Sequence, residues 1–139
     1  MIRKNVRYII IIIILSFILV GCNQSEFFND YESFKSSYLK VTDVLDLKKP
    51  LTSIEMLHSE PILKEIKELE SFVTEMEEEA STKHEKGILG NVSNYYEGLE
   101  FLLYAAKNID KLSEDERGRI GRELTFVEMN RRKIERGEI

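Results

Sequence analysis

Glutamate and histidine are the only residues of this sequence whose spacing is typical of metal chemistry. Glu55 and His58 are three positions apart, and on a helix this Glu-x-x-His spacing places both side chains on one face, as in di-iron bundles. Such a site needs a second Glu-x-x-His pair and two further glutamates, whereas Ser81 stands three positions before His84. We therefore interpret Glu55 and His58 as surface residues, and we predict no metal, no cofactor and no catalytic residue.

A run of glutamates near position 78 is the second feature that could bind a ligand. Glu75, Glu77, Glu78 and Glu79 could attract Ca²⁺ or a basic partner. Consecutive side chains on a helix point in different directions, however, and without backbone carbonyls they do not form a chelating cage. We interpret this run as a solvated helix face.

The composition limits the class of protein. The chain has 139 residues, which is enough for one domain, and its 20 Lys and Arg against 25 Asp and Glu give a formal net charge of -5. This acidity argues against nucleic acid as a partner. With no nucleophile and base in a recognisable pattern, we expect a protein that is not an enzyme.

The single cysteine lies at the end of an unusual N-terminal segment. Arg3, Lys4 and Arg7 form a basic start, and residues 8–20 form an almost entirely apolar run. Thirteen helical residues reach about 20 Å, which is shorter than the roughly 30 Å hydrocarbon core of a bilayer. This length favours the apolar region of a signal peptide over a permanent membrane span. Cys22 follows this run directly.

The residues around this cysteine, Leu19-Val20-Gly21-Cys22, resemble the lipobox of bacterial lipoproteins. The resemblance covers residues 1–22 only. It implies that Cys22 receives a diacylglyceryl group, with palmitate as a typical acyl chain. It also implies that the signal peptidase recognises Leu19, Val20 and Gly21 and removes residues 1–21. The protein would then be anchored by lipid on the extracytoplasmic side of the cell membrane. The alternative is an uncleaved signal anchor.

Apolar residues after position 26 recur every three or four positions, which predicts amphipathic helices. The first helix is expected over 27–45, with Pro50 ending the segment. A short helical turn over 52–58, opened by a capping box at Thr52, and a main helix over 60–83 follow. Glycines in 86–90 predict a break, after which Asn91 starts the third helix. A capping box at Ser113 starts the fourth.

This pattern predicts an all-α fold, a small antiparallel bundle of about four helices that follows a cleaved signal peptide. The expected organisation is a signal peptide over 1–21, a short lipidated connector over 22–26 and the helical bundle over 27–136. The pattern leaves open whether the bundle is closed or grooved. It also leaves open whether the acidic helix over 60–79 pairs with the basic residues of 117–136 within one chain.

Five residues are the candidates for an interaction surface. Phe28 and Phe101 lie off the apolar stripes of their helices, so they could form an exposed aromatic patch. Arg131, Arg132 and Lys133 could contact anionic lipid or a wall polymer.

The expected function is that of a membrane-anchored surface lipoprotein. We expect a non-enzymatic protein-binding module at the outer face of the cytoplasmic membrane. It is similar in size and cellular location to lipoproteins that act as exclusion or immunity factors. The alternatives are a structural accessory subunit of an envelope or secretion machine, and a lipoprotein that binds a hydrophobic ligand or peptide. The expected partners are the membrane, through the N-terminal lipid, and an envelope protein; a homo-oligomer is left open.

Overall fold

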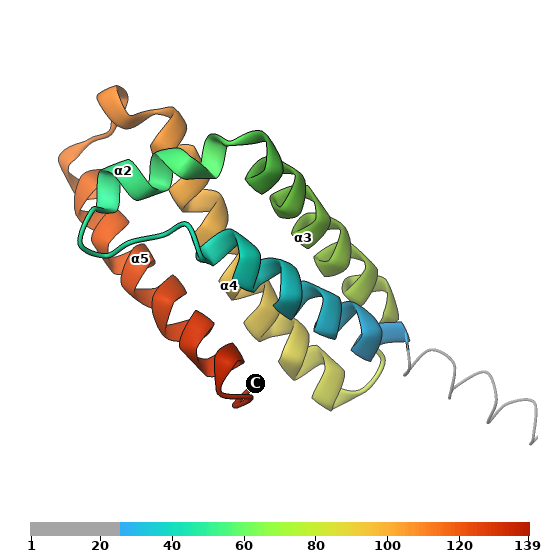
Figure 1. The fold of residues 1–139 in the computed structure, drawn as a ribbon. Coiled ribbons are helices and arrows are strands. Elements are labelled where there is room, and N and C mark those ends of the chain that lie inside the picture. Colours follow the sequence, from blue (N-terminus) through green and yellow to red (C-terminus); the bar gives the residue numbers. More distant parts are fainter. Residues whose placement is uncertain (1–25) are drawn as a thin grey trace, which may run out of the picture.

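The computed structural model describes residues 26–139, and these residues form an all-helical bundle (Figure 1). The first helix covers residues 26–42 and is followed by α2 (Pro50–Glu55), the 3-10 helix η1 (Met56–His58) and α3 (Glu60–Glu79). Then come α4 (Lys83–Lys107), the 3-10 helix η2 (Ile109–Lys111) and α5 (Glu114–Glu135). The predicted all-α fold class is therefore confirmed. The predicted signal peptide, its lipobox and the connector up to residue 25 lie outside the described residues.

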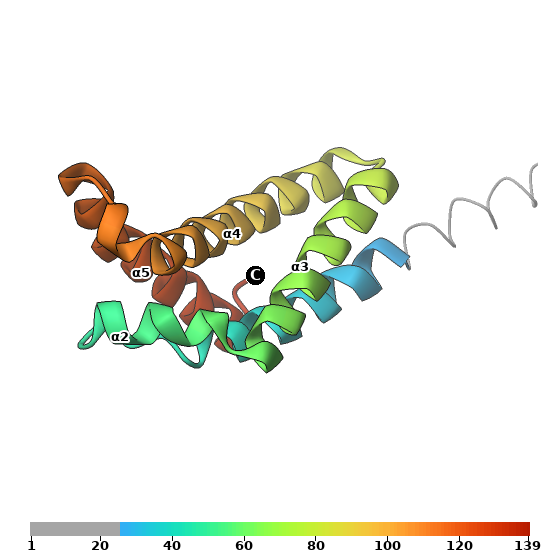
Figure 2. The same cartoon turned by 90° about the horizontal axis from the view of Figure 1, so that it is seen from above.

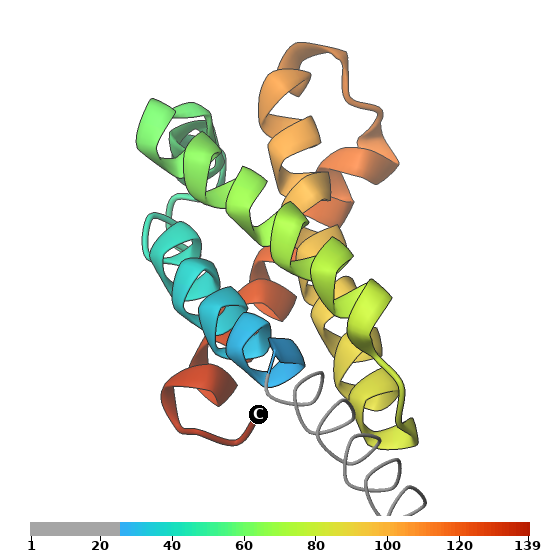
Figure 3. The same cartoon turned by 90° about the vertical axis from the view of Figure 1, so that its right-hand side faces the viewer.

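The four long helices alternate in direction, as Figure 1 shows. The first helix and α3 run side by side, joined by an ion pair between Lys40 and Glu65 at 3.0 Å (Figure 2). α4 packs against both α3 and α5, which lie on different sides of it (Figure 3). Within residues 26–139, no ion pair joins α3 to α5. The acidic and basic helices thus do not neutralise each other within this part of the chain.

The predicted apolar stripes form the core. The first helix buries four residues of its stripe, and each of the three other long helices buries its own set: Phe27, Phe34, Tyr38 and Val41; Ile66, Leu69, Val73 and Met76; Val92, Tyr95, Leu99 and Leu102; Ile120, Leu124, Val127 and Ile134. Isolated helices of this length are marginally stable in water, so this packing supplies most of the stability.

The first helix ends earlier than its apolar pattern predicts. It stops at residue 42, where the Thr42 hydroxyl donates a hydrogen bond to the Tyr38 carbonyl at 2.8 Å, and residues 43–49 form a loop. Pro50 begins α2, because its missing N–H and fixed φ suit the first position of a helix. The predicted capping box at Thr52 is therefore wrong. Lys49 occupies the cap position and makes no side-chain cap.

The predicted break over 86–90 is also wrong. α4 begins at Lys83 and continues through both glycines to Lys107. It begins there because Thr82 and Glu85 form a reciprocal capping box, whose cap residue Thr82 lies nine residues before the expected cap at Asn91. α3 correspondingly ends at Glu79 instead of residue 83. The capping box predicted at Ser113 is confirmed, with Glu116 as its partner.

Replacing a glycine in the middle of a continuous helix with alanine stabilises the protein if no atom occupies the space that the new methyl group needs. A Cβ at Gly90 would meet no atom within 4 Å, so Gly90→Ala should raise the free energy of unfolding by about 1 kcal/mol. Chemical denaturation followed by circular dichroism measures this. Gly137→Ala is the matched control, because Gly137 has a φ of +65°, a conformation that residues with a side chain rarely adopt, and this variant should lose stability. A loss of stability in Gly90→Ala would contradict the continuous helix.

Candidate interaction site

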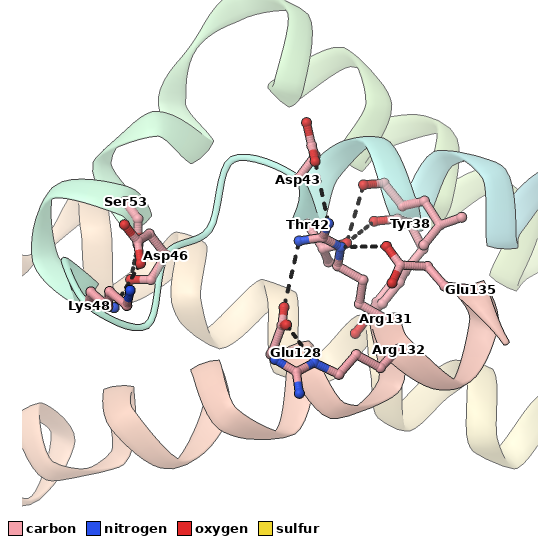
Figure 4. Close-up of polar contacts among 11 residues, drawn as sticks. Tyr38, Thr42, Asp43, Asp46, Lys48, Ser53, Glu128, Arg131, Arg132 and Glu135 are labelled. Carbon is pink, nitrogen blue, oxygen red and sulfur yellow. Dashed lines mark hydrogen bonds and ion pairs between the residues drawn. The ribbon is translucent and has the colours of Figure 1, made fainter.

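The loop over residues 43–49 has a fixed geometry set by Asp46. Its carboxylate accepts a hydrogen bond from the Lys48 N–H at 2.8 Å, and its carbonyl accepts one from the Lys49 N–H at 3.1 Å. The Ser53 hydroxyl of α2 donates to the same carbonyl at 3.3 Å (Figure 4). Such an Asx turn gives the loop a single preferred conformation. Leu47, at the tip of this turn, is therefore held in place although it is 48% exposed.

Arg131 joins this part of the chain to α5. Its guanidinium lies 3.5 Å from the Asp43 carboxylate, just after the first helix, and also contacts Glu128 at 3.6 Å and Glu135 at 3.1 Å (Figure 4). Arg132, the next residue, pairs with Glu128 at 2.9 Å. Exposed ion pairs are each worth only about 0–1 kcal/mol, so this network orients the loop and α5 more than it stabilises the fold.

An open groove of about 370 Å³ lies between the loop and α5. We call it the loop–α5 groove. Its six lining residues are Leu47, Thr125, Glu128, Met129, Arg132 and Arg136. Leu47 and Met129, each nearly half exposed, supply its apolar surface. Both arginines already have a carboxylate partner, since Arg136 pairs with Glu138 at 2.6 Å. The groove thus offers apolar contacts beside arginines whose surface ion pairs can be exchanged at little cost.

The five residues predicted as an interaction surface have different environments. Phe28 is 39% exposed and lies against His84, with ring centroids 6.4 Å apart. Phe101 is half-buried under the guanidinium of Arg119, which is 4.0 Å from its ring centroid. His84 and Phe101 are about 25 Å apart along α4, so the two phenylalanines do not form one patch.

The three basic candidates follow one another on α5, and the structure gives them different roles. Arg131 is mostly covered and holds the loop in place. Arg132 lines the loop–α5 groove, and Lys133 is half-buried. Sequence reasoning missed Leu47 and Met129, whose only signal was an apolar side chain off the stripes. It also missed Asn130, which occupies a core position between Val127 and Ile134.

The residues that suggested metal chemistry do not converge. Glu55 ends α2 and His58 ends η1, and both residues are exposed. Of the glutamate run, Glu79 alone is half-buried. Burial and the nearby Asp30 carboxylate raise the pKa of Glu79. Among residues 26–139, no three His, Cys, Asp or Glu side chains are arranged to hold a metal ion.

Comparison with protein-family models, with curated proteins and with solved structures finds no match for this chain. Among the helices that begin at or after residue 26, none is both long enough and apolar enough to cross a membrane.

Proposed function

We propose that this chain is a lipid-anchored surface lipoprotein that binds another protein, without catalysis, at the outer face of the cytoplasmic membrane. The observation that carries the binding part is the loop–α5 groove. Its apolar residues are Leu47 on the loop and Met129 on α5, and both are exposed. The turn at Asp46 fixes the conformation of the loop, and the Arg131–Asp43 ion pair orients the loop against α5. Methionine is common on surfaces that accept varied partners, because its side chain is flexible and polarisable.

The lipobox-like residues support the anchoring part of the proposal. Only three residues separate Cys22 from Glu26, the first described residue of the first helix. A chain of this length spans at most about 14 Å between the two Cα atoms. A lipid on Cys22 therefore keeps the bundle against the membrane. The natural partner is an integral membrane protein or another envelope protein, as an exclusion or immunity factor or an accessory subunit would require.

Site-specific cross-linking in living cells tests both parts together. A photoreactive amino acid at position 129 should cross-link one envelope protein, whereas the same amino acid at the exposed position Thr74 of α3 should not. Cys22→Ser, which cannot be lipidated, should abolish the cross-link and the incorporation of labelled palmitate. Labelling without a position-129 cross-link would refute the groove as the binding site. Equal labelling of Cys22→Ser would refute the anchor.

A further inference from the structure

α5 buries a polar residue in the middle of its core face. The buried residues of this helix recur as Ile120, Leu124, Val127, Asn130 and Ile134. Asn130 is only 1% exposed, so its amide is as inaccessible as the leucines around it. An amide in this position has to find hydrogen-bond partners inside the protein, because water does not reach it.

The Tyr38 hydroxyl of the first helix, which is fully buried, lies next to the Asn130 side chain. Burial raises the pKa of Tyr38, and a hydrogen-bond-like contact with the Asn130 side chain opposes part of that rise. The geometry of this contact falls short of a hydrogen bond, and within residues 26–139 no other group pairs with the Tyr38 hydroxyl or with either polar atom of the Asn130 amide. Buried polar atoms without partners raise the free energy of the state that buries them. The cost here is specific to the contact between α5 and the first helix.

The last three turns of α5 contribute few fully buried residues to the core. Between residues 125 and 135, only Val127 and Ile134 are buried apolar residues, and Phe126 is partly buried against the core. Of the ion pairs in this segment, only Arg131–Asp43 reaches another element, and the rest lie within α5. By contrast, α4 buries Leu99, Leu102, Ala105 and Ala106 within about two turns. Segments with few buried apolar contacts open at lower free energy than the rest of a fold.

We propose that residues 125–135 of α5 form a flap that opens locally while the other helices stay packed. Opening separates the Phe126 ring from Tyr95, now 6.1 Å apart between centroids, and uncovers an aromatic surface formed by Phe34, Tyr38 and Tyr95. The flap carries four of the six residues of the loop–α5 groove, and Arg136 follows it directly, so the groove exists only when the flap is closed. A partner in the groove therefore stabilises closure, and an open flap lowers the apparent affinity for that partner.

Hydrogen exchange of the intact chain in detergent micelles tests the flap without any partner, so its outcome is independent of the proposed function. Amides of residues 126–135 should exchange at least about 100-fold faster than amides of residues 99–106 of α4. Equal protection of the two segments would mean that α5 opens only in global unfolding, and this result would overturn the proposal.

A substitution of Asn130 tests whether its buried amide causes the local opening of residues 125–135. Asn130→Leu replaces the amide with an apolar group of similar size, and it should slow exchange of residues 126–135 at least about tenfold and leave α4 unchanged. The double variant that combines Tyr38→Phe with Asn130→Leu should slow the exchange of residues 126–135 further. Met129→Leu is the matched control, because Met129 is adjacent but exposed, and it should have no effect. Unchanged or faster exchange in Asn130→Leu would refute the role of the amide.

Discussion

Leu102→Asp is expected to unfold the helical domain. Leu102 of α4 is fully buried within the core, and an isolated carboxylate there loses its hydration without gaining a partner. The resulting penalty of several kcal/mol is comparable to the whole stability of a small domain, which is about 5–15 kcal/mol. Leu69→Asp on α3 should have the same effect for the same reason. Circular dichroism at 222 nm during heating measures the loss of the cooperative transition.

The matched control for this prediction is Leu51→Asp. Leu51 is 48% exposed and lies in the first turn of α2, so a carboxylate at this position stays hydrated. Surface substitutions of this kind usually change stability by no more than about 0.5 kcal/mol. If Leu102→Asp kept a cooperative transition close to that of Leu51→Asp, the core at α4 would not be a closed apolar interior.

The core was predictable from the sequence because helical burial leaves a period in the chain. Leu69 and Leu102 each belong to a stripe with a residue every three or four positions, and the structure buries both. Helix boundaries were less predictable because they depend on competing local signals. Gly87 and Gly90 suggested a break, yet each costs only about 1 kcal/mol relative to alanine. The capping box at Thr82 and the packing of the residues that follow offset this cost.

The interaction site was largely unpredictable for a different reason. Leu47 and Met129 are far apart in the sequence and meet in one groove, where the Asx turn at Asp46 and the Arg131–Asp43 ion pair orient the loop against α5. Neither contact leaves a periodic pattern. Asn130 was missed because a single polar residue in an apolar stripe does not disturb the period, although its burial changes how firmly α5 is held.

Glu85→Ala is expected to lower the thermal stability of the domain at neutral pH. The Glu85 carboxylate accepts hydrogen bonds from the backbone N–H groups of Thr82 at 2.8 Å and Ser81 at 2.9 Å, and from the Ser81 hydroxyl at 3.0 Å. These groups lie at the start of α4, where the N–H groups lack partners within the helix. Because Glu85 is almost fully covered, water replaces its carboxylate poorly once the side chain is removed.

The pH dependence of this effect has a definite sign. Hydrogen bonds from the backbone of Thr82 and Ser81 lower the pKa of Glu85 from 4.5 to about 2. A carboxyl whose pKa is lower in the folded state stabilises that state above the unfolded pKa. This contribution is lost as the pH falls through the folded value. The difference in melting temperature between the wild type and Glu85→Ala should therefore be constant above about pH 5 and shrink progressively toward pH 2.

The capping box at Ser113 shows how much of the effect of Glu85 depends on its burial. Glu116 accepts hydrogen bonds from the Ser113 N–H at 2.8 Å and the Ser113 hydroxyl at 2.7 Å, so its chemistry matches that of Glu85. Glu116 is only partly buried, so water can take over these bonds more readily in Glu116→Ala than in Glu85→Ala. The melting temperature at pH 7 should fall less for Glu116→Ala than for Glu85→Ala. Equal losses would show that the charge at the helix start matters and its burial does not. A loss in Glu85→Ala that stays constant down to pH 3 would show instead that Glu85 acts through packing.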